Sequence, residues 1–147
     1  MSRPTVDEYF MQIARVVSTR ATCNKEHVGA VLVRDQHILA SGYNGAPTGI
    51  DHCTESGCNR PHAEHGTQYE LCKAVHAELN CLLWAARHGV SVNYSTMYCT
   101  HAPCLQCTKA MINAGVSRVV VGNDTWQTDV LKMLHDAGIE YVELYFA

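Results

Sequence analysis

Long apolar runs and clusters of positive charge are both missing from this chain of 147 residues. A membrane-spanning helix needs about 20 consecutive apolar residues, and no run approaches that length, so no membrane segment is expected. Residues 1–8 lack the apolar core of a signal peptide, which predicts a cytoplasmic protein. The net charge is −3 and Lys and Arg are scattered, so nucleic acid is not an expected partner.

Charged residues are also few, at 17%, whereas hydrophobic residues make up 47% of the chain. This composition is typical of a folded globular protein and excludes a disordered chain. The length predicts a single domain over residues 1–147 that can bury a core. Eight cysteines in a chain without an export signal indicate metal binding or catalysis before disulfides.

Apolar periodicity predicts an alternation of helices and short strands. The expected helices are residues 5–19, 69–88, 103–114 and 129–137. The expected strands are residues 28–33 and 37–42, joined as a hairpin, and then residues 96–100, 116–122 and 139–144. Residues 43–69 show no periodicity and are expected to form a long loop. This order predicts an α/β fold, a mixed five-stranded sheet with helices on both faces.

Two short motifs contain the ligands of a metal site, H-A-E at residues 76–78 and P-C-L-Q-C at residues 103–107. One imidazole and two thiolates suit zinc, and three protein ligands leave a fourth position for water. His76, Cys104 and Cys107 are therefore the expected ligands of a catalytic zinc. Glu78 is expected to be the carboxylate that moves protons beside it.

Each motif alone has a simpler interpretation. A lone C-x-x-C also occurs in redox pairs and in structural zinc sites. A His-x-Glu pair on a helix often just faces solvent. The two motifs together, in this order and with Pro103 directly before Cys104, favour the catalytic interpretation.

The combination H-x-E…P-C-x-x-C is the signature of zinc deaminases, and through it the chain resembles the cytidine and deoxycytidylate deaminase family. The resemblance covers nearly the whole chain and implies a three-layer αβα fold with a five-stranded mixed sheet. It also implies hydrolytic removal of the C4 amino group of a cytosine nucleotide, with Glu78 as the proton shuttle.

Three further stretches are similar to the deoxycytidylate deaminases, phage members among them. They are G-Y-N-G-A-P-T-G at residues 42–49, H-A-E-L-N at residues 76–80 and T-C-N-K-E-H-V-G-A at residues 22–30. By itself, Asn-Gly followed by Pro indicates only a turn. The resemblance implies dCMP as substrate and dUMP as product. The implied substrate contacts are Asn24, Lys25, Asn44, Ala77, His101 and Ala102, although Lys25 is equally typical of a plain surface lysine.

The resemblance further implies a homohexamer that dCTP activates and dTTP inhibits, with magnesium accompanying the triphosphate. The residues implied in the effector site are Tyr43, Asn44, Gly45 and Arg87. One departure concerns the segment after the fourth strand, where Trp126 stands in place of the family's Tyr.

A second, structural zinc is also implied by phage relatives, through Cys23 and Cys53. Cys72 and His65 would complete its ligand set, with Cys58 as the alternative fourth ligand. A long loop without regular structure would gain order from such a metal. The alternative is that some of these thiols are merely buried, as free cysteines often are.

Two other function classes stay open at this stage. A deaminase of free cytidine or of a base in RNA or DNA has the same fold, but a base editor needs basic and aromatic surface segments that are not visible here. A non-catalytic, zinc-stabilised binding module has no use for a carboxylate at Glu78.

Overall fold

The computed structural model describes residues 2–122 and 124–145, and it has the expected α/β architecture. Its sheet contains β1 (Gly29–Arg34), β2 (His37–Tyr43), β3 (Thr96–Cys99), β4 (Arg118–Gly122) and β5 (Glu140–Leu144). The strand order is β2-β1-β3-β4-β5. β1 pairs antiparallel with β2 and β3, whereas β3, β4 and β5 are parallel. The prediction of a mixed five-stranded sheet is confirmed.

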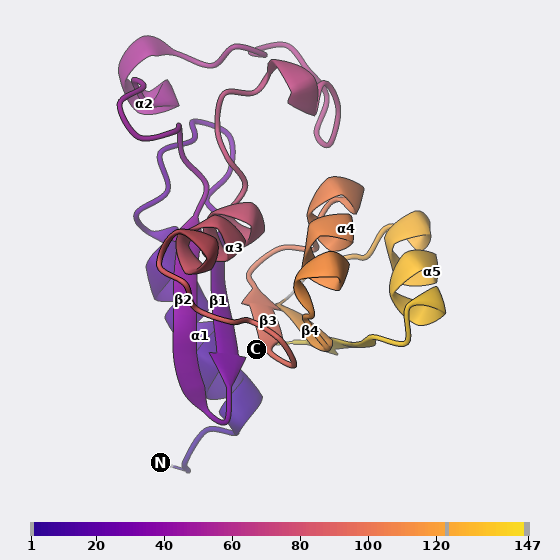
Figure 1. Cartoon of the computed structure of the whole chain (residues 1–147). Coiled ribbons are helices and arrows are strands. Elements are labelled where there is room, and N and C mark those ends of the chain that lie inside the picture. Colours follow the sequence, from indigo (N-terminus) through magenta and orange to yellow (C-terminus); the bar gives the residue numbers. More distant parts are fainter. Residues whose placement is uncertain (1, 123, 146–147) are drawn as a thin grey trace.

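Helices cover both faces of this sheet (Figure 1). One face packs against α1 (Val6–Ser18), and the other against α3 (Ala77–Arg87), α4 (Leu105–Ala114) and α5 (Thr128–Asp136). Strand β1 is buried on both sides because its side chains alternate between the two cores. Ala30 and Leu32 join the core under α3, and Val31 and Val33 join the core under α1.

The predicted helix over residues 69–88 begins too early. Only a single 3-10 turn, η1 (Tyr69–Leu71), forms at its start, and α3 begins at Ala77. The reason is that Val75 makes an isolated bridge with Gly45, with backbone N–H groups donating in both directions at 2.8 and 3.2 Å. Periodicity cannot reveal this pairing, because it joins residues thirty apart in the sequence.

The expected loop over residues 43–69 also holds one short helix, α2 (Cys53–Ser56). The whole segment between β2 and α3 projects beyond the sheet, at the top of Figure 1. None of the helices in the described residues is long and apolar enough to cross a membrane.

The start of α1 is fixed to the sheet by an ionic network around Asp7. Its carboxylate accepts two hydrogen bonds from the Arg118 guanidinium, at 2.8 and 2.7 Å, and a third from the Tyr98 hydroxyl at 2.7 Å. The Arg118 guanidinium lowers the pKa of Asp7, and the Tyr98 hydroxyl acts in the same direction. This network joins α1 to β3 and β4.

We predict that Asp7→Asn lowers the free energy of unfolding by about 2 kcal/mol at neutral pH, because hydrogen bonds to a charged group are lost. Because the folded protein lowers the pKa of Asp7, this stabilisation is complete above the unfolded pKa and is lost as pH falls through the folded value. Denaturant unfolding from pH 7 to pH 2 should show the variant and the wild type converging in acid.

The matched control is Asp51→Asn, at an exposed position, which should stay within about 0.5 kcal/mol of the wild type. A constant difference between Asp7→Asn and the wild type down to the lowest pH would contradict the role given to the Asp7 charge.

Candidate active site

Two helices begin next to each other at the carboxyl edge of the parallel strands. His76 is the N-cap of α3 and Cys104 is the N-cap of α4, each with an extended backbone (ψ 152° and 169°). Pro103 therefore precedes the cap and stands two residues before the first helical residue, Leu105, whereas the expected helix began at Pro103. A cap position directs the side chain away from the helix body, so both ligands reach a common point instead of following separate helix faces.

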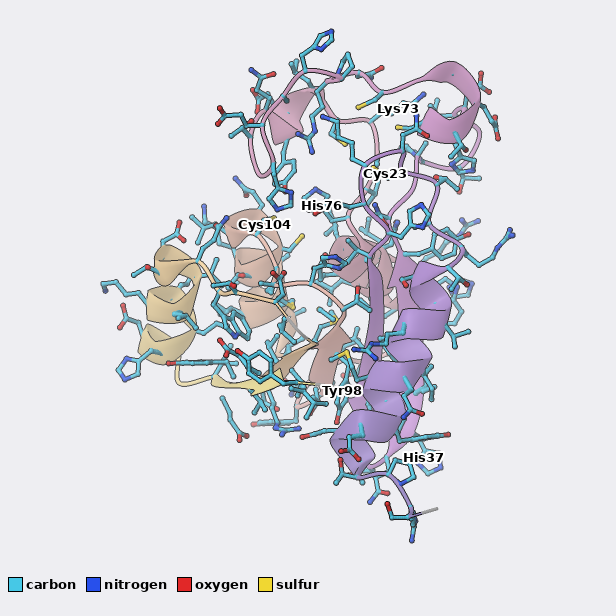
Figure 2. All side chains as sticks on the ribbon, turned by 180° about the vertical axis from the view of Figure 1, so that it is seen from behind. Cys23, His37, Lys73, His76, Tyr98 and Cys104 are labelled. Carbon is cyan, nitrogen blue, oxygen red and sulfur yellow. The ribbon has the colours of Figure 1, made fainter. Side chains whose placement is uncertain are left out.

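His76, Cys104 and Cys107 form a compact group of possible metal ligands. The His76 Nδ1 lies 3.5 Å from the Sγ of Cys104 and 3.5 Å from the Sγ of Cys107. Zinc bonds of about 2.0 and 2.3 Å in tetrahedral geometry place nitrogen and sulfur about 3.5 Å apart. The donor set and its spacing therefore fit zinc. Figure 2 labels His76 and Cys104 beneath the projecting segment.

The surroundings favour thiolates at this group. The Cys104 Sγ accepts one hydrogen bond from the backbone N–H of Cys107, at the positive end of the α4 dipole. The Cys107 thiol, with further help from His76, lowers the pKa of Cys104. Within residues 2–122 and 124–145, this is the sole group whose ligand atoms all lie within 4.8 Å of one another.

Glu78 lies in the first turn of α3, two residues after His76, and only 4% of it is exposed. Burial raises the pKa of its carboxyl group. A carboxyl group that is shielded from bulk water and close to the ligands can exchange protons with a bound molecule.

Glu78 and the ligands His76 and Cys104 line a cavity of about 470 Å³. Of the expected substrate contacts, this cavity is lined by Lys25, Asn44, Ala77, His101 and Ala102. The fold thus gathers five of the six expected contact residues, from four separate segments of the chain, around one cavity.

Asn24 is the exception among the expected contacts, since it does not line the cavity. Its side-chain amide donates to the Cys53 carbonyl at 2.9 Å, so it connects the loop before β1 to the start of α2. Asn44 is 7% exposed and also has a structural role. Its Oδ1 accepts from the Val28 N–H at 2.8 Å and its Nδ2 donates to the Glu26 carbonyl at 2.9 Å. One N–H of Asn44 is left for a ligand.

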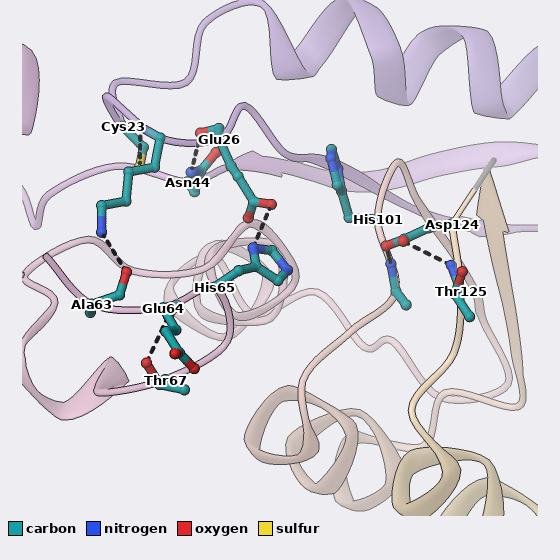
Figure 3. Close-up of polar contacts among 12 residues, drawn as sticks. Cys23, Glu26, Asn44, Ala63, Glu64, His65, Thr67, His101, Asp124 and Thr125 are labelled. Atoms are coloured by element: carbon teal, nitrogen blue, oxygen red, sulfur yellow. Dashed lines mark hydrogen bonds and ion pairs between the residues drawn. The ribbon is translucent and has the colours of Figure 1, made fainter. Parts of the chain in front are cut away.

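Among the cavity-wall residues that were not predicted from the sequence are Arg60, Tyr69 and Asp124. The Tyr69 ring meets the His76 ring edge-on, with 4.7 Å between centroids. Asp124 accepts from the Ala102 N–H at 2.6 Å and from the Thr125 N–H at 2.8 Å, so it fixes the segment before Pro103 (Figure 3). All three lie in segments without periodicity, and no sequence pattern marks them.

A second cavity of about 630 Å³ lies along the edge strand β2 and α3. Of the residues implied in the effector site, Tyr43, Gly45 and Arg87 line it, together with Asn80 and Trp84. Asn44 belongs to the first cavity instead.

The expected second zinc set is not gathered as predicted. His65 lies against Glu26, with its Nδ1 3.0 Å from the carboxylate (Figure 3). The Cys53 thiol is buried, which raises its pKa, and the thiols of Cys23, Cys58 and Cys72 raise the pKa further. Among the described residues, the ligand atoms of the expected set lie within 4.8 Å of one another neither with His65 nor with Cys58 as the fourth member.

A mixed sheet between helical layers, with one His and two Cys ligands beside a buried Glu at helix starts, is the arrangement of the zinc deaminases. The family model for the cytidine and deoxycytidylate deaminase zinc-binding region matches residues 4–123. The chain therefore belongs to the cytidine and deoxycytidylate deaminase family, as the motifs predict.

Individual relatives agree with this assignment. A deoxycytidylate deaminase of Saccharomyces cerevisiae is 36% identical over 147 residues, which are 99% of this chain and 47% of that protein. The deoxycytidylate deaminase of Mycobacterium phage D29 is 38% identical over 125 residues, 82% of this chain and 96% of the phage protein. The chain spans about half the length of the two yeast relatives it matches.

Among solved structures, the dCMP deaminase of cyanophage S-TIM5 in complex with dCMP and dUMP superposes with a TM-score of 0.81. The two proteins are 30% identical, and the match covers 98% of this chain and 100% of the cyanophage chain.

Gly42 on β2 sets how closely α3 can approach the sheet. A Cβ atom at this position would lie 2.5 Å from the Ala77 carbonyl oxygen and 2.7 Å from the Cys81 nitrogen. Both contacts are backbone atoms of α3, so the helix would have to move. Gly42 thereby places the helix start that carries His76 and Glu78.

We predict that Gly42→Ala lowers the free energy of unfolding by about 1–3 kcal/mol and weakens zinc binding, because α3 shifts away from Cys104. Calorimetric unfolding and competition with a zinc chelator measure the two effects. Ser41→Ala is the control, since Ser41 is exposed and already has a Cβ. Wild-type zinc affinity in Gly42→Ala would contradict the positioning role.

Proposed function

We propose that this protein hydrolyses the C4 amino group of dCMP, giving dUMP and ammonia. The observation that carries the proposal is Glu78, a buried carboxyl group in the first turn after His76, within a cavity that can hold a nucleotide. Support also comes from the cyanophage dCMP deaminase, whose structure contains dCMP and dUMP. A non-catalytic binding module gives no reason to bury this carboxyl group.

In this proposal His76, Cys104 and Cys107 hold the zinc. When bound there, zinc supplies Lewis acidity that makes water a better nucleophile at neutral pH. Glu78 carries a proton to the cytosine ring nitrogen N3 and another to the departing amine. The carbonyl groups next to Ala102, a segment fixed by Asp124, accept hydrogen bonds from the amine. Asn44 uses its remaining N–H for the sugar.

The decisive assay is ammonia release from dCMP, deoxycytidine and CMP by zinc-loaded protein. We expect turnover of dCMP, and we expect Glu78→Gln to lower kcat by about 10²–10⁴-fold, because proton transfer is lost while the side-chain shape is kept. Zinc content and unfolding temperature should match the wild type.

Glu55→Gln, at an exposed position, is the matched control and should keep full activity. Undiminished deamination by Glu78→Gln would remove Glu78 from the mechanism. A wild-type protein that is loaded with zinc and releases no ammonia from any of the three compounds would overturn the proposed function.

For regulation, we propose that the second cavity binds the effector nucleotides, with dCTP activating and dTTP inhibiting, each accompanied by magnesium. Support comes from the position of this cavity, which borders α3 at Asn80 and Arg87. A ligand there can therefore shift the helix whose first turn carries Glu78. The homohexamer implied by the family stays a prediction.

We further propose a structural zinc held by Cys23, Cys53, Cys58 and Cys72. The Sγ atoms of Cys23 and Cys58 each accept a backbone N–H from two residues further on, at 3.3 and 3.4 Å. Such bonds stabilise thiolates and suit metal ligands. The thiols come from four points along the projecting segment and its base, so one ion would connect them.

Zinc analysis by mass spectrometry should find two ions per chain in the wild type and one in Cys58→Ser, because three ligands hold a structural zinc poorly. His65→Ala should keep two, since His65 serves Glu26. One ion lost in His65→Ala and none in Cys58→Ser would restore the originally expected ligand set.

A further inference from the structure

Arg60 is the residue of the cavity wall whose role the motifs leave unexplained. It follows α2 in the projecting segment, and its guanidinium lies over the Tyr69 ring, 4.8 Å from the centroid. One Nη1–H donates to the Thr67 carbonyl at 2.8 Å. The side chain is thus held in a definite direction by a ring face and a backbone group.

The guanidinium has unused donors. Its Nε is buried and has no hydrogen-bond partner, and no ion pair joins Arg60 to a carboxylate within residues 2–122 and 124–145. A partly buried cation with an unsatisfied N–H is costly unless an anion completes it. A guanidinium fork matches phosphate oxygens in two parallel hydrogen bonds.

The position of Arg60 is tied to the reaction centre. Tyr69, on which it stacks, meets the zinc ligand His76 edge-on at 4.7 Å. The Arg60 guanidinium therefore contacts Tyr69, and Tyr69 in turn contacts a proposed zinc ligand. Lys25, in the same wall, donates from its Nζ to the carbonyls of Arg60 and Ala63 at 2.6 and 3.3 Å. Lys25 thus anchors the Arg60 segment as well as adding a second positive charge.

The acidic residues near this wall are already engaged. Glu26 pairs with His65, and Asp124 accepts from two backbone N–H groups (Figure 3). The carboxylates are thus partly satisfied, whereas Lys25 and Arg60 have no carboxylate partner among the described residues. Lys25 and Arg60 thus place two positive charges in a wall that also contains the carboxyl groups of Glu26, Glu78 and Asp124.

We propose that Arg60 binds the 5′-phosphate of the substrate and makes the site select a nucleoside monophosphate over the nucleoside. This inference rests on the proposed deamination. Tyr69 serves as the platform that orients the guanidinium, and Lys25 fixes the backbone at Arg60 from the other side of the segment.

The test compares dCMP with deoxycytidine in Arg60→Gln and Arg60→Lys. Arg60→Gln should lower kcat/KM for dCMP by about 10–100-fold, mainly through KM, because charge-assisted hydrogen bonds to the phosphate are lost. Its kcat/KM for deoxycytidine should stay within about twofold of the wild type. Arg60→Lys should fall between the two, since Lys keeps the charge but not the fork.

Calorimetric titration with dUMP gives a measurement that needs no turnover, and its dissociation constant should rise by a similar factor in Arg60→Gln. Arg20→Gln, at an exposed arginine outside the cavity, is the control and should change neither quantity. An unchanged preference for dCMP over deoxycytidine, with unchanged dUMP affinity, would overturn the role of Arg60 alone. Absence of deamination by the wild type would instead overturn the proposed function.

Discussion

The chemistry of this protein depends on two helices that begin at the same point, with His76 and Cys104 as their N-caps. Because each cap residue has an extended backbone, its side chain points away from its own helix. The side chains of His76 and Cys104 therefore approach each other. The helix dipoles then favour negative charge where Cys104 and Cys107 meet. The bridge between Gly45 and Val75 ends the preceding segment at the right residue for α3 to begin at Ala77.

The cavity wall contains groups of both charges. Glu78 is buried next to the expected ligands, while Arg60, in the projecting segment, and Lys25, in the loop before β1, add positive charge. A nucleotide has the same polarity, with a base that exchanges protons and a phosphate that carries negative charge. The proposed structural zinc would hold the projecting segment, which supplies Arg60. Phosphate recognition by Arg60 would therefore depend on the metal that orders this segment.

Sequence patterns predicted the mixed sheet and the grouping of His76, Cys104 and Cys107 with Glu78 nearby, because these depend on local periodicity and on closely spaced motifs. They failed where contacts between distant residues decide the outcome. The helix start was misplaced because Val75 pairs with Gly45, and the contact of His65 with Glu26 was not foreseen. Arg60 and Tyr69 were missed because a loop without periodicity gives no signal before it is folded.

The central claim is that this site adds water to the cytosine ring and releases the amine. The most direct measurement is mass spectrometry of the product formed from dCMP in water enriched in ¹⁸O. The account predicts dUMP with one heavy oxygen on the ring and an equal amount of ammonia. Conversion without incorporation of solvent oxygen, or no conversion by zinc-loaded protein, would contradict it.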